Sequence, residues 1–171
     1  MTRSIIARLA PLSLGLALAS ASSGCSSSSN GCSVSFSGFV SESGSVAPGC
    51  GTLTQDPDAG ATGGYVLALS ATSSHVANLE VQIDLGATPA TGMFSSDTIM
   101  NWSAIGVGVS GCGYGAGNEA VPTGNFTLKV TDVTKDASPV AHGTLDITLY
   151  VHAPPMTDCG PDETEDVQFT F

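Results

Sequence analysis

The sequence predicts an all-β domain, an antiparallel sandwich of two sheets with about eight strands. Apolar and polar residues alternate with a period of two in several segments, and turn-forming Gly, Pro, Asp and Asn residues separate these segments. No segment repeats its apolar residues at the 3.6-residue spacing of an amphipathic helix. Short strands of this kind are typical of a sandwich or a barrel, and we expect the sandwich.

The strongest alternation lies in the segment 141–153, where Leu145, Ile147, Leu149 and Val151 are separated by polar residues. The same period of two occurs at 79–85 and 126–131. It places one face of each strand on the core and the other in water, so these three segments are expected to form the centre of the core. Shorter strands are expected at 34–40, 51–54, 65–70, 99–109 and 167–171, and long loops at 56–64 and 111–117.

The first 24 residues have the pattern of a secretory signal peptide. Arg3 and Arg8 precede an apolar run at 9–19, and small residues follow up to Gly24. The run is too short for a permanent membrane helix, which needs about 20 apolar residues. We therefore expect residues 1–24 to be removed during export.

Ser23-Gly24-Cys25, followed by four serines, resembles the lipobox of bacterial lipoproteins. The resemblance implies that a peptidase cuts before Cys25 and that a lipid on this cysteine anchors the chain. Serine after the cysteine resembles the signal for the outer membrane, on its periplasmic or surface face. Ser22 departs from the family, which most often has leucine there, and cleavage by the general signal peptidase would instead leave Cys25 as a thiol.

After export, residues 25–31 are expected to form a serine-rich flexible tether and residues 32–171 a single domain. Removal of the signal peptide takes away both arginines. The remaining two lysines, Lys129 and Lys135, stand against fifteen acidic residues, a formal charge of −13. Such a chain repels nucleic acid and anionic lipid surfaces, so its expected membrane contact is the lipid anchor.

If Cys25 carries the lipid, four cysteines remain, and an even number in an oxidising compartment indicates two disulfides. Of the three possible pairings we favour Cys32 with Cys50 and Cys112 with Cys159, because each pair flanks strands that are neighbours in sequence. Zinc is not expected, because no two of these cysteines have the short spacing of a zinc knuckle.

Carboxylates are densest just before the last expected strand. Clustered carboxylates suit Ca²⁺, which takes several oxygen ligands, and the candidate ligands are Asp158, Asp162, Glu163 and Asp166. The competing explanation, which we favour, is a charged loop that keeps a sheet edge soluble. Asp56-Pro57-Asp58-Ala59-Gly60 begins like an EF-hand loop, but it lacks a third ligand and is expected to be a linker, although both segments could share one ion.

The familiar catalytic patterns are missing from the sequence. Residues 106–111 match G-x-G-x-x-G by letter, but no helix can follow, so a nucleotide site is not expected. His142 and His152 lie on one expected strand, about 33 Å apart, and cannot share a metal. There is no H-E-x-x-H or G-x-S-x-G motif. Trp102 is expected in the core rather than on a ligand platform.

The function expected from these observations is that of a non-catalytic envelope or cell-surface module that binds protein or glycan through its loops. The mature chain resembles small, cysteine-containing secreted proteins, a resemblance that implies no activity. Two alternatives remain open: a Ca²⁺-dependent adhesion domain, and an exported hydrolase with a dispersed Ser, His and Asp triad.

Overall fold

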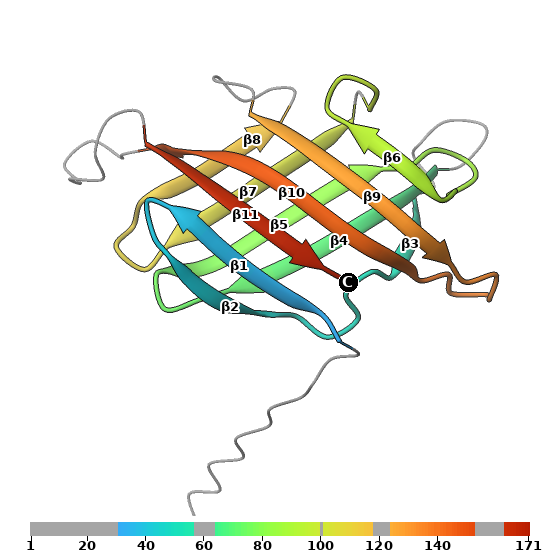
Figure 1. Ribbon diagram of the computed structural model, residues 1–171, viewed down its shortest axis with the longest axis horizontal. Coiled ribbons are helices and arrows are strands. Elements are labelled where there is room, and N and C mark those ends of the chain that lie inside the picture. The colour runs from blue at the N-terminus through green and yellow to red at the C-terminus, as the bar shows by residue number, and fades with distance from the viewer. Residues whose placement is uncertain (1–30, 57–63, 100, 118–123, 153–162) are drawn as a thin grey trace, which may run out of the picture.

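The computed structural model describes residues 31–56, 64–99, 101–117, 124–152 and 163–171, which form strands and turns without a helix (Figure 1). No helix in these residues is long and apolar enough to cross a membrane. The expected signal peptide, residues 1–24, and Cys25 lie outside the described residues. The strands are β1 (Ser33–Gly38), β2 (Glu42–Val46), β3 (Leu53–Asp56), β4 (Gly64–Thr72), β5 (Val76–Asp84), β6 (Gly92–Ser95), β7 (Trp102–Gly108), β8 (Gly113–Gly117), β9 (Asn125–Val133), β10 (Ala141–His152) and β11 (Thr164–Thr170).

Eight of these strands close into an antiparallel β-barrel. Its order is β1-β2-β4-β5-β7-β8-β10-β11, and β11 pairs again with β1. The all-β prediction is confirmed, but the two-sheet sandwich is wrong. Two short pairings continue the ladder around the corners where a sandwich would have free edges: β2 with β4 at Ser45 and Val46, and β8 with β10 at Gly113 to Gly115.

The three remaining strands extend the barrel wall. β3 pairs with β4 beside β2, β9 pairs with β10 beside β8, and β6 pairs with β9 (Figure 1). Gly44 lies in β2 close to the corner with β4, where a Cβ atom would come within 2.8 Å of the side chains of Val34 and Phe36. The sharp corner therefore requires glycine at this position.

The core fills the barrel with inward-facing residues that alternate along each strand. The three segments with the clearest alternation are confirmed as β5, β9 and β10. Trp102 is 6 % exposed, as expected of a core residue, and its ring meets that of Phe126 at a centroid distance of 4.9 Å in an edge-to-face arrangement. This contact joins β7 to β9 through the interior of the molecule.

The loop expected at 111–117 is wrong over most of its length, because residues 113–117 form β8. In β8, Tyr114 and Ala116 are buried on the inward face, and glycines occupy the positions between them. This alternation is that of a strand with one face on the core. Residues 57–63, the centre of the other expected loop, lie outside the described residues.

A disulfide joins Cys32, before β1, to Cys50, before β3, with a Cα–Cα distance of 6.7 Å. This is the pairing favoured from the sequence. Cys112 is also disulfide-bonded. Its expected partner, Cys159, lies outside the described residues.

Candidate functional site

One end of the barrel is closed by the connections β1–β2 (39–41), β4–β5 (73–75) and β7–β8 (109–112). We call it the turn end; it lies on the left in Figure 1. The backbone N–H of Val109 donates to the carbonyl of His75 over 2.7 Å, which ties two of these turns together. The opposite end holds the beginning of β1 and the last residues of β5.

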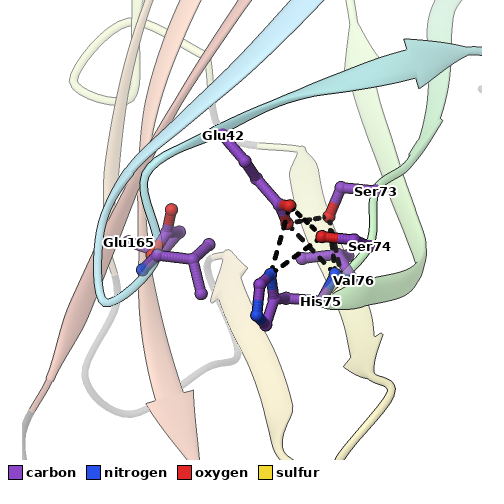
Figure 2. A network of polar contacts seen from close by, with 7 residues as sticks. Glu42, Ser73, Ser74, His75, Val76 and Glu165 are labelled. Atoms are coloured by element: carbon purple, nitrogen blue, oxygen red, sulfur yellow. Dashed lines mark hydrogen bonds and ion pairs between the residues drawn. The ribbon is translucent and has the colours of Figure 1, made fainter.

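Glu42 is the centre of a polar network at the turn end (Figure 2). The hydroxyls of Ser73 and Ser74 donate to its two carboxylate oxygens, and the backbone N–H of His75 donates to Oε1 over 3.1 Å. These bonds, above all the Ser73 and Ser74 hydroxyls, lower the pKa of Glu42 to about 2. The Ser73 hydroxyl also accepts from Val76 N over 2.9 Å, so Glu42 stabilises the β4–β5 turn as an ionised group.

Ser74, His75 and Glu42 are the residue types of a hydrolytic triad, but their geometry differs from one. Ser74 Oγ lies 3.0 Å and Glu42 Oε2 3.1 Å from the same imidazole nitrogen, Nδ1. A triad requires the serine on Nε2 and the acid on Nδ1. Because both groups share one nitrogen, His75 is not oriented to take a proton from Ser74 on Nε2 while Glu42 holds its Nδ1–H.

Glu165 lies beside this network, inside the barrel, with no exposed surface (Figure 2). Its Oε2 accepts from the backbone N–H of Val40 over 2.9 Å, whereas its buried Oε1 has no hydrogen-bond partner in the described residues. Burial is the main cause that raises the pKa of this carboxyl. Glu165 also contributes to the raised pKa of Tyr114, whose first cause is burial.

Of the four carboxylates that the sequence proposed as calcium ligands, the structure describes Glu163 and Asp166. Glu163 and Asp166 are exposed, whereas Glu165 points inward from the alternate face of β11. Asp166 Oδ1 accepts from the hydroxyl of Thr148 over 2.7 Å. Asp158, Asp162 and Asp58 lie outside the described residues. Within the described ranges, no three His, Cys, Asp or Glu side chains are grouped to hold a metal.

A depression of about 460 Å³ lies at the end of the barrel opposite the turn end, between the end of β5, β6 and the start of β7. Asp84, Thr98 and Asn101 give it polar groups, and Leu85, Phe94 and Ile99 give it apolar surface. Asp84 Oδ1 accepts from Gly86 N over 2.8 Å. The Asn101 side chain is exposed and makes no hydrogen bond to the described part of the chain.

The sequence analysis missed both the depression and the turn-end network. Each joins segments that are separate in sequence: Glu42 meets a serine 31 residues away, and the depression combines residues from 84 to 101 that carry no common motif. Comparisons with family models, curated proteins and solved structures find no match for this chain.

Proposed function

We propose that this protein is an exported lipoprotein, anchored through Cys25, whose barrel is a non-catalytic module that binds a neutral glycan in the depression at Asp84. The carrying observation is the composition of that depression. A carboxylate and an amide that makes no hydrogen bond to the described residues stand beside a half-buried aromatic ring on one open surface.

This combination fits the chemistry of a sugar. Asp84 would accept hydrogen bonds from sugar hydroxyls, and the Asn101 amide would both donate and accept. The Phe94 ring offers an apolar surface to the C–H groups of a pyranose. The formal charge of −13 expected after export opposes anionic polysaccharides, so the proposal is limited to neutral glycans.

Ser74 and Glu42 both contact Nδ1 of His75, so these three residues do not have the geometry of a catalytic triad. This arrangement supports a binding role rather than hydrolysis. The position of the depression also supports a role close to the membrane. β1 begins at the end of the barrel that carries Asp84, and the expected tether 25–31 comes just before β1 in the sequence. The seven residues 25–31 extend to at most about 25 Å.

Two experiments test this proposal separately. Metabolic labelling with a fatty-acid analogue should label the wild-type protein, and Cys25→Ser should lose both the label and membrane retention. Binding to an array of neutral oligosaccharides should be lost in the double variant Asp84→Asn, Asn101→Ala. The matched control Asp136→Asn, an exposed acid between β9 and β10, should bind like the wild type. Equal binding by all three proteins would refute this site.

A second candidate, binding to another protein, is favoured by an apolar stripe that runs along the outer face of β7 into the β7–β8 turn. Ile105, Val107 and Val109 are 66, 51 and 66 % exposed. Ile105 pairs with Gly115 and Val107 with Gly113 on β8, so no side chain on that strand covers them. Crosslinking on intact cells, with Ile105→Thr and Val107→Thr as the comparison, tests whether this stripe contacts a partner.

A further inference from the structure

The β1–β2 turn is fastened to the first residues of β11 by two hydrogen bonds. Phe39 N donates to the carbonyl of Thr164 over 3.2 Å, and Val40 N donates to the Glu165 carboxyl over 2.9 Å. The second bond depends on a side chain that can gain or lose a proton. Whether the turn stays closed over the barrel end is therefore coupled to the state of Glu165.

The surroundings of Glu165 are unfavourable for a negative charge. Glu42 faces it from β2 and Tyr114 from β8, while Asp166 is its neighbour on β11; all three are acidic groups. The described residues supply no salt bridge to Glu165, and none of them donates a hydrogen bond to its buried Oε1. An ionised Glu165 would hold charge on that oxygen without compensation.

We propose that Glu165 is a proton-operated latch: with its carboxyl neutral the β1–β2 turn stays closed on the barrel, and loss of the proton to water opens the turn. Opening hydrates the carboxylate and moves it away from Glu42. It also gives solvent access to the inward-facing side chains at this end, including Tyr114.

The direction of the effect follows from linkage. Burial raises the pKa of Glu165 in the closed state, and it outweighs the amides of Val40 and Phe39, which pull the pKa down. In the open state the carboxyl titrates in water, near the ordinary pKa of about 4.3. The closed state therefore holds the proton more tightly. The proton on Glu165 therefore stabilises the closed state relative to the open state. This stabilisation is fully present below the open-state pKa and is lost as pH rises through the closed-state pKa.

Amide hydrogen exchange in the intact protein measures the latch. After correction for the intrinsic exchange rate, the opening constant for the Phe39 and Val40 amides should increase between pH 4 and 8. The increase should be about tenfold for each unit by which closure raises the pKa. The ¹³C shift of the Glu165 carboxyl should titrate over the same range. A flat opening constant, or a carboxyl that titrates near 4.3, would overturn the proposal.

Glu165→Gln keeps the shape of the side chain and cannot ionise, so its opening constant should be independent of pH. The exposed neighbour Glu163→Gln is the matched control and should retain the wild-type dependence. His75→Gln removes the imidazole that contacts Glu42. This variant should also keep the wild-type pH dependence of the opening constant. If His75→Gln abolishes the pH dependence, the Glu42 network is the switch and Glu165 is not. The wild-type carboxyl titration decides the matter even if Glu165→Gln fails to fold.

Discussion

The backbone N–H of Val40 donates to Oε2 of Glu165 over 2.9 Å, joining residues that are 125 positions apart in sequence. This bond ties the first hairpin of the chain to its last strand. It also places beneath the turn a buried carboxyl whose Oε1 has no hydrogen-bond partner in the described part of the chain. The same barrel end contains Glu42. Two carboxyls therefore lie close together, one with a lowered pKa (Glu42) and one with a raised pKa (Glu165).

Glu42→Gln should destabilise the fold at neutral pH. Hydrogen bonds to a charged group contribute about 1.5–3 kcal/mol, and Glu42 accepts several. Since the pKa of Glu42 is lowered to about 2, its contribution is present above the ordinary Glu pKa of about 4.3 and is lost as pH falls toward 2. Urea unfolding of the variant and wild type should therefore converge in acid. Glu80→Gln, on the exposed face of β5, should show no such pH-dependent difference.

Removal of the disulfide between Cys32 and Cys50 should lower the free energy of unfolding by about 3 kcal/mol. The bond closes a loop with a sequence separation of 18, and a crosslink of that span restricts the unfolded chain by about this amount. The double variant Cys32→Ser, Cys50→Ser should show the loss in denaturant unfolding. A midpoint unchanged from that of the oxidised wild type would show that this bond does not contribute to stability.

Phe126→Ala should cost about 3–5 kcal/mol, because Phe126 is fully buried and packs on Trp102. Trp102 is the single tryptophan of the chain and reports the change directly through its fluorescence. Its emission should shift to longer wavelength in the variant as water reaches the ring. Emission identical to that of the wild type would contradict the edge-to-face contact between β7 and β9.

Ca²⁺ should leave the melting temperature of the mature protein unchanged. In the described part of the chain no three His, Cys, Asp or Glu side chains are grouped to hold a metal, and a ligand stabilises only the state that binds it. Thermal unfolding in chelator and then in a few millimolar Ca²⁺ tests this. A rise of several degrees would restore the Ca²⁺-dependent adhesion hypothesis and direct mutagenesis to Asp158 and Asp162.

Local alternation predicted the strands but not how they close. The period of two at 79–85, 126–131 and 141–153 identified β5, β9 and β10, because it depends only on which face meets the core. A barrel and a sandwich share that pattern. Their difference lies in the corner pairings of Ser45 with Thr72 and Tyr150 with Gly115, which join distant segments and leave no local signal.

The candidate sites were harder to predict for the same reason. Glu165 lies among acidic residues just before the strand expected at 167–171. Because β11 begins earlier, at Thr164, the period of two places Glu165 on the same inward face as Val167 and Phe169. Ser73 and Ser74 resemble ordinary turn residues until Glu42 of β2 is placed against them. Asp84 and Asn101 meet because β5 ends where β7 begins, an arrangement fixed by pairing rather than by composition.

The most direct test of the account is an NMR titration of the mature protein with the neutral oligosaccharide that binds best on the array. The account predicts saturable shifts confined to the amides around Asp84, Phe94 and Asn101, and their loss in Asp84→Asn, Asn101→Ala. Shifts centred on another surface, or saturable shifts that persist unchanged in the double variant, would contradict it.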